Sequence, residues 1–138
     1  MVDALIRAKR WLAPSGVVID LRPAEVVPDI EIGLADGTVL RVGQPVVGEE
    51  RRARHRSADR ALRTVIERGV FEVTHEEQFS FFYHADSPGE LREHLVTKWR
   101  ETRIDHDTYA RLTAAVYTHP DGRLMLREQV GIRRLQPR

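Results

Sequence analysis

The 138-residue sequence contains no cysteine, which excludes disulfide bonds, thiolate metal sites and cysteine nucleophiles. Lysine occurs only at Lys9 and Lys98, so the basic charge is almost entirely arginine. The formal net charge is only +1, which argues against a broadly basic nucleic-acid binder. No apolar run approaches the ~18 residues that would span a bilayer, and charged residues interrupt the first ten positions. We therefore expect a soluble, cytoplasmic protein with no membrane contact.

The apolar pattern predicts an α+β fold in one domain, residues 1–138, with a single mixed β-sheet, a β-hairpin and packed helices. Asp3 is expected to cap a first helix that ends before Pro14. Residues 17–21 follow as a strand in which apolar residues do not alternate with polar ones. This run predicts a central or parallel strand that is covered on both faces.

Strict alternation of apolar and polar residues begins at Asp29 and predicts a hairpin around Ala35-Asp36-Gly37. A two-residue turn would put the two apolar faces out of phase. We therefore expect a three-residue loop with Gly37 in the left-handed conformation. This loop sets Ile32 opposite Leu40 and Ile30 opposite Val42.

The second part of the chain predicts three helices and further strands. A helix at about 50–68 is expected to end at Gly69 and to bury a stripe of small and aliphatic residues. Two strands, "VFEV" and residues 78–84, follow it, and Ser87-Pro88-Gly89-Glu90 is typical of a capping box that opens the next helix. A shorter helix is expected to be capped by Asp107, and residues 124–135 form the last strand.

The segment "AKRWLAPSGVVIDLRP" resembles the part of class I S-adenosylmethionine-dependent methyltransferases in which a helix ends in a Leu-x-Pro-Gly-Gly-type turn and enters the fifth strand. Leu12, Pro14 and Gly16 match, and Ser15 stands in place of the first glycine. "ERGVFE", "FSFFYH" and "DSPGELREHLVTKW" then follow in the order of the family's later half. The resemblance implies the C-terminal half of a methyltransferase, with the second half of a Rossmann-like sheet.

The resemblance also implies that the cofactor-binding half of the fold is absent. In the family a glycine-rich turn and an acidic residue on the second strand hold the cofactor, and both would precede residue 1. No two of the nine glycines here have G-x-G spacing. Asp20 is expected to act as a cap or to lie in a loop, not to bind a ribose. We expect no cofactor, no binding of S-adenosylmethionine to this chain alone, and no catalytic or metal-binding residues.

Aromatic residues crowd the strand at 78–84 and are candidates for lining a small-molecule pocket. The candidate pocket residues are Phe79, Phe81, Phe82, His84, Trp99 and Glu128. By alternation Glu128 lies on the apolar face of the last strand, where an ionised carboxylate needs a partner, and an arginine is the expected one. The alternatives are that this face opens to solvent or that Gly131 marks a bulge that resets the alternation.

The segment "RRARHRSADRALR" places four arginines at helical spacing on one face of the helix at 50–68. These anion-binding candidates are Arg52, Arg56, Arg60 and Arg63. A row of this kind could neutralise the phosphates of a nucleic acid or of another anionic ligand. Acidic residues on the same helix dilute the positive charge, and a solvated arginine face is the ordinary explanation.

Two functions remain as hypotheses. The first is a non-catalytic, methyltransferase-like domain that acts as a binding or assembly module. The second is binding of nucleic acid or an anionic ligand through the arginine-rich helix at 50–68. Without the family's first half, one edge of the strand at 17–21 would be unpaired. We expect a homodimer or a partner chain to cover this edge, or the hairpin at 30–42 to do so.

Overall fold

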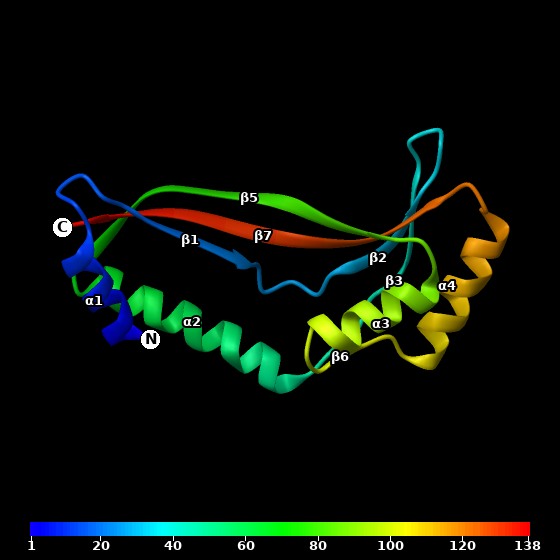
Figure 1. The fold of residues 1–138 in the computed structure, drawn as a ribbon, viewed down its shortest axis with the longest axis horizontal. Helices are drawn as coiled ribbons and strands as arrows, with labels where there is room; N and C mark the ends of the chain where they lie inside the picture. The colour runs from blue at the N-terminus through cyan, green and yellow to red at the C-terminus, as the bar shows by residue number, and fades with distance from the viewer. The chain divides into compact units, whose positions relative to one another are not determined.

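The computed structural model describes residues 1–138 and confirms an α+β fold of four helices and antiparallel strands (Figure 1). The helices are α1 (Val2–Trp11), α2 (Glu49–Glu67), α3 (Pro88–Lys98) and α4 (His106–Thr118). The strands are β1 (Val18–Pro23), β2 (Asp29–Gly33), β3 (Val39–Gly43), β4 (Val46–Val47), β5 (Phe71–Ala85), β6 (Thr102–Arg103) and β7 (Arg123–Pro137).

The long strand β7 pairs with three others in a five-stranded sheet. Residues 130–135 of β7 pair with β1, and residues 123–127 pair with β2. β5 also pairs with β7, and β3 pairs with β2. β4 and β6 form a separate two-stranded ladder, which the sequence did not predict. Every ladder with a defined register is antiparallel.

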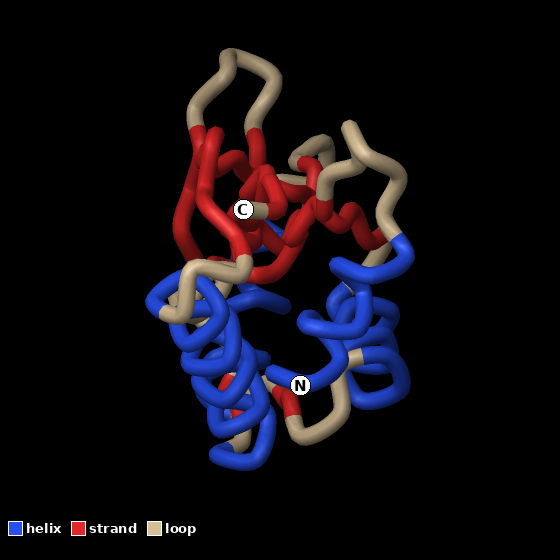
Figure 2. Tube along the Cα trace, turned by 90° about the vertical axis from the view of Figure 1, so that its left-hand side faces the viewer, coloured by secondary structure: helices blue, strands red, loops and turns tan.

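The chain divides into two compact units, and β5 and β7 contribute residues to both. Unit 1 comprises Met1–Glu25, Arg52–Phe79 and Val130–Arg138, and unit 2 comprises Val26–Arg51 and Ser80–Gln129. Within each unit the helices lie on one side of the five-stranded sheet (Figure 2). The single domain stays a prediction, since compactness alone does not show whether either unit folds without the other.

The core of unit 1 forms where the apolar stripe of α2 packs on the strands and on α1. Leu62, Val65, Phe71 and Leu135 are its buried centre. The predicted stripe of α2 is confirmed, with Ala58 and Ala61 also buried. Gly69 follows the helix with a φ of +65°, a conformation that favours glycine, and so confirms the predicted end of the helix.

The core of unit 2 lies between its strands and helices α3 and α4. Its largest buried side chains are Ile30, Leu91, Leu95, Leu112 and Leu126. The capping box that opens α3 is confirmed, because Ser87 Oγ accepts a hydrogen bond from the Glu90 amide at 3.1 Å. The Glu90 carboxylate accepts in return from the Asp86 amide at 2.7 Å.

The three-residue loop of the β2–β3 hairpin is confirmed. The Leu34 amide donates to the Thr38 carbonyl at 2.8 Å, Gly37 has a φ of +85°, and Ile32 faces Leu40. The expected pair of Ile30 and Val42 is wrong. A register shift between Ile30 and Glu31 places Ile30 opposite Gly43 instead.

The expected burial of the first strand on both faces is also wrong. β1 pairs only with β7 and is therefore an edge strand. Its apolar residues Ile19 and Leu21 are 54% and 57% exposed, while Val18 and Asp20 point inward. The hairpin does not cover this edge, because β2 pairs with β7 and not with β1.

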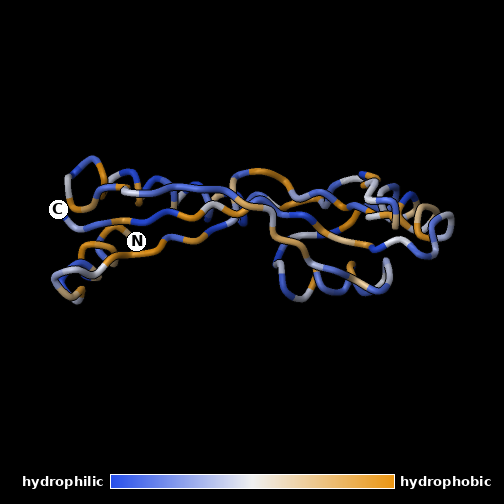
Figure 3. The backbone as a smooth tube through the Cα atoms, turned by 90° about the horizontal axis from the view of Figure 1, so that it is seen from above, coloured by the Kyte–Doolittle hydropathy of each residue, from blue (hydrophilic) through white to orange (hydrophobic).

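Three smaller expectations fail at helix ends and strand bounds. Met1, not Asp3, is the N-cap residue of α1. Asp105, not Asp107, caps α4, where its carboxylate accepts from the Thr108 amide at 2.7 Å. The two strands expected at 70–73 and 78–84 are one continuous strand, β5, whose part in unit 1 is largely hydrophilic (Figure 3).

Candidate functional site

A groove of about 670 Å³ lies in unit 1 between α2 and the strands. β1, β7 and β5 supply one side of it, and α2 supplies the other. The apolar part of its lining includes Leu62, Ile66 and Val73. Nine charged side chains make up most of the remaining lining, and five of them are arginines. The groove is therefore an arginine-rich site with apolar contacts from both α2 and β5.

The position of α2 follows from its own sequence. Its small and aliphatic stripe is buried, so the residues that flank the stripe face the groove. Arg56, Arg60 and Arg63 lie among these flanking residues. With a rise of about 1.5 Å per residue, the row extends along about 10 Å of the helix.

Three of the four predicted anion-binding candidates thus line one groove. Arg56, Arg60 and Arg63 are exposed side chains in its wall, while Arg52 does not line it. Sequence periodicity alone placed all four on one face. The structure separates Arg52 from the three arginines that line the groove.

Two further arginines come from the strands and were not predicted. Arg22 lies on β1 and Arg133 on β7, and both point toward α2 in the groove. The alternation of β1 carried a signal, since Asp20 and Arg22 alternate along the strand with the exposed residues Ile19 and Leu21. Their opposite charges at a spacing of two would have predicted an ion pair on one strand face.

Asp20, Arg22, Asp59, Glu76 and Arg133 form one charged cluster in the groove, here called the groove cluster. Arg22 Nε lies 2.7 Å from Asp20 Oδ1, and its Nη2 donates to Asp20 Oδ2 at 2.9 Å. The expectation that Asp20 is a cap or a loop residue is therefore wrong. Its carboxylate orients Arg22 from within β1.

The other half of the groove cluster is built around Arg133. Its Nε donates to Glu76 Oε1 at 2.6 Å, and its Nη1 lies 3.6 Å from Asp20. The hydrogen bond with Glu76 raises the pKa of Arg133 above its ordinary value, so this guanidinium stays charged at every accessible pH. Asp59 from α2 lies between Arg22 and Arg133.

The six predicted pocket residues do not line this groove. Phe79, Phe81 and Phe82 are between 42% and 51% exposed along β5. Phe82 and His84 stack with their ring centroids 6.4 Å apart. A ligand pocket shared by these residues stays a prediction.

Trp99 and Glu128, the other two, meet around one arginine in unit 2. Arg51 Nη2 lies 3.6 Å from Glu128 Oε1, and its guanidinium lies 4.4 Å from the centroid of the Trp99 ring. Arg51 is the arginine partner expected for Glu128. The β1–β7 ladder passes through Gly131 without a register shift, so the alternative of a bulge there is excluded. Burial raises the pKa of Glu128, and the charge of Arg51 opposes that rise.

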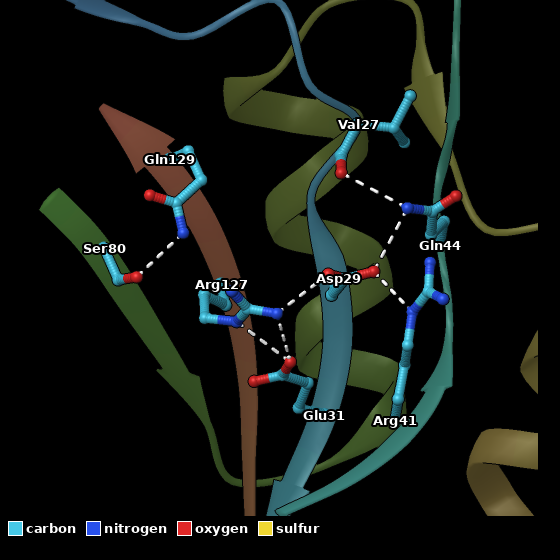
Figure 4. A network of polar contacts seen from close by, with 8 residues as sticks. All are labelled: Val27, Asp29, Glu31, Arg41, Gln44, Ser80, Arg127 and Gln129. Atoms are coloured by element: carbon cyan, nitrogen blue, oxygen red, sulfur yellow. Dashed lines mark hydrogen bonds and ion pairs between the residues drawn. The ribbon is translucent and has the colours of Figure 1, made fainter. Parts of the chain in front are cut away.

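A second charged network in unit 2 joins β2, β3 and β7 (Figure 4). Arg127 Nη2 lies 2.8 Å from Glu31 and 3.0 Å from Asp29. Arg41 and Gln44 donate to the same Asp29 oxygen at 2.6 Å and 3.1 Å. Each group in this network has a partner, and we assign the network a structural role.

The described residues contain no group of three or more histidine or acidic side chains arranged to hold a metal ion. No helix is both long enough and apolar enough to cross a bilayer. The chain matches no protein-family model, no curated protein sequence and no solved structure. The groove in unit 1 is therefore the feature of the chain that bears most directly on its function.

Proposed function

We propose that the chain is a non-catalytic binding module that holds a small anionic ligand in the groove of unit 1. The observation that carries this proposal is that five arginines, three from α2 and one each from β1 and β7, line a single groove. The planar guanidinium group suits phosphate and carboxylate oxygens, which it can bind through two hydrogen bonds. Arg60 and Arg63 have no acidic side chain as an ion-pair partner, so they are available to such a ligand.

The lining favours a small anion over a nucleic acid. Four carboxylates, those of Asp20, Glu25, Asp59 and Glu76, also face the groove. A continuous phosphate backbone would pass close to them and be repelled. A small ligand can place its charge beside the α2 arginines and its body against Leu62, Ile66 and Val73. We therefore propose a ligand that combines one anionic group with an apolar body.

Binding of phenyl phosphate, followed by NMR shifts or calorimetry, tests this function. We expect the double variant Arg60→Gln with Arg63→Gln to bind at least about tenfold more weakly than the wild type, a loss of ~1.4 kcal/mol. Arg52→Gln is the control for the single variant Arg60→Gln, because each removes one arginine charge from α2, Arg52 outside the groove and Arg60 inside it. We expect it to change Kd by less than about twofold.

Two results would overturn the proposal. One is that phenyl phosphate does not bind at millimolar concentration. The other is that Arg52→Gln weakens binding as much as Arg60→Gln does, which would indicate a diffuse arginine face and would favour nucleic acid instead. Steep dependence of duplex binding on salt would support that second reading.

A second proposal, assembly as a homodimer, has its own observation. β1 is an edge strand with two exposed apolar side chains, Ile19 and Leu21. The methyltransferase resemblance stays a prediction. We expect Leu21→Lys to lower the apparent mass in sedimentation at micromolar concentration. Val96→Lys, at an exposed apolar position of α3, is the control and should leave it unchanged. A monomeric wild type would contradict this proposal.

A further inference from the structure

We propose that Asp59 is an internal competitor for the groove's ligand and that the group it competes with is a phosphate monoester. This inference rests on the function proposed above. In the groove without ligand, the Asp59 carboxylate occupies the position that the phosphate of the bound ligand would take.

The Asp59 carboxylate lies close to two arginines of the groove cluster. Its Oδ1 lies 3.0 Å from Arg22 Nη2 and 3.8 Å from Arg133 Nη1. One acidic oxygen thus lies between two guanidinium groups that come from different strands. An external anion that contacts both arginines would take this position, and Asp59 already occupies it.

Neither Arg22 nor Arg133 needs Asp59 as its ion-pair partner, because each has another carboxylate. Arg22 keeps Asp20, which contacts it through both carboxylate oxygens at 2.7 Å and 2.9 Å. Arg133 keeps Glu76, which accepts its hydrogen bond at 2.6 Å. The Asp59 side chain is also 40% exposed, so it can turn into solvent without leaving a buried charge unpaired. Its displacement therefore costs little.

The net charge of the groove cluster indicates the class of ligand. The groove cluster has three carboxylates and two guanidinium groups, so it carries a net charge of −1 while Asp59 is in place. When Asp59 turns away, one negative charge leaves the two arginines. A ligand that replaces it binds these arginines more strongly if it carries more than one negative charge. A phosphate monoester brings up to two charges and three oxygens on one centre, which suits two guanidinium groups and the nearby arginines of α2.

The variant Asp59→Asn tests this assignment, with phenyl phosphate as the probe. We expect its affinity for the probe to rise about fivefold, because the phosphate no longer has to displace a carboxylate that is bound to Arg22 and Arg133. Glu67→Gln is the first control, since it makes the same charge change on α2 at a residue that does not line the groove. Glu76→Gln is the second, because it removes a charge from the groove cluster but leaves Asp59 in place. Neither control should raise affinity by more than about twofold.

The outcomes separate this inference from the proposed function. If Asp59→Asn binds no more tightly than the wild type, or if Glu76→Gln raises affinity equally, Asp59 is not a competitor. The proposed function would still stand if Arg60→Gln with Arg63→Gln weakens binding. If neither the wild type nor Asp59→Asn binds phenyl phosphate, both proposals fail. Thermal unfolding of each variant shows that the fold is retained.

Discussion

The guanidinium of Arg127 lies 2.8 Å from the carboxylate of Glu31, a side chain that is only 6% exposed. Asp29, which lies opposite Arg127 in the β2–β7 ladder, holds the same guanidinium at 3.0 Å. The pair joins two strands that are far apart in the sequence. A charge as buried as that of Glu31 is tolerated only while its partner remains in place.

The first prediction concerns the loss of this partner. Arg127→Ala should lower the free energy of unfolding by about 3 kcal/mol, because it leaves the buried carboxylate of Glu31 without a cation. The double variant Arg127→Met with Glu31→Leu should lose less, since it removes both charges and keeps the volume. Urea unfolding of the two variants measures the difference. An equal loss in both would mean that the ion pair itself, and not an orphaned charge, determines the stability.

The second prediction is a pH dependence at Glu128. Burial raises the pKa of this carboxyl in the folded state, so above the unfolded value of about 4.3 the folded chain holds a proton that the unfolded chain has released. The contribution of Glu128 to stability therefore falls as the pH rises through this window, and it is constant at lower pH, where both states are protonated.

Glu128→Gln removes this titration while keeping the shape of the side chain. The stability of the wild type relative to Glu128→Gln should therefore decrease between pH 4.5 and neutral pH. Urea unfolding of both proteins at several pH values measures this difference. A relative stability that increases with pH would show that Arg51, at 3.6 Å, outweighs burial.

The features that sequence predicted correctly are those that depend on near neighbours in the chain. The loop at Gly37 and the capping box of Ser87 and Glu90 each follow from a few adjacent residues. The ladder partners of β1 depend on residues more than a hundred positions away, and its apolar composition alone suggested the wrong burial. An apolar edge strand and a central strand can have the same composition. The composition of a strand therefore does not show how many neighbouring strands it has.

The groove also could not be predicted in full from local sequence, because it depends on which strands pair. The arginine row of α2 was visible from helical spacing, but Arg22, Glu76 and Arg133 belong to three different strands. Only the pairing of those strands brings these side chains under α2. Helical spacing alone likewise does not show that Arg52 lies outside the groove.

The third prediction concerns the capping box of α3. Ser87→Ala should destabilise the protein by about 1 kcal/mol, because the Glu90 amide at the helix start loses its acceptor. Ser87→Asp is the matched control. It keeps an acceptor and places a negative charge at the positive end of the helix, so it should be close to the wild type. If both variants are equally destabilised in thermal unfolding, the hydroxyl of Ser87 contributes through packing and not through capping.

The fourth prediction uses two glycines whose backbones differ. Gly37 has a φ of +85° and nothing lies within 4 Å of the place where a Cβ would be, so the effect of a side chain there is purely conformational. Gly37→Ala should lower the free energy of unfolding by about 1 kcal/mol, and Gly37→Asn should lower it less, because asparagine tolerates the left-handed region.

Gly89, in the first turn of α3, is the control position, because its φ is ordinary and the nearest atom to an added Cβ would lie at 3.8 Å. The control variant is Gly89→Ala. It should leave stability unchanged or raise it, because alanine restricts the unfolded chain. Chemical denaturation of the three variants at one temperature makes the comparison, and a loss at Gly89 as large as that at Gly37 would contradict the assignment of the cost to the left-handed backbone.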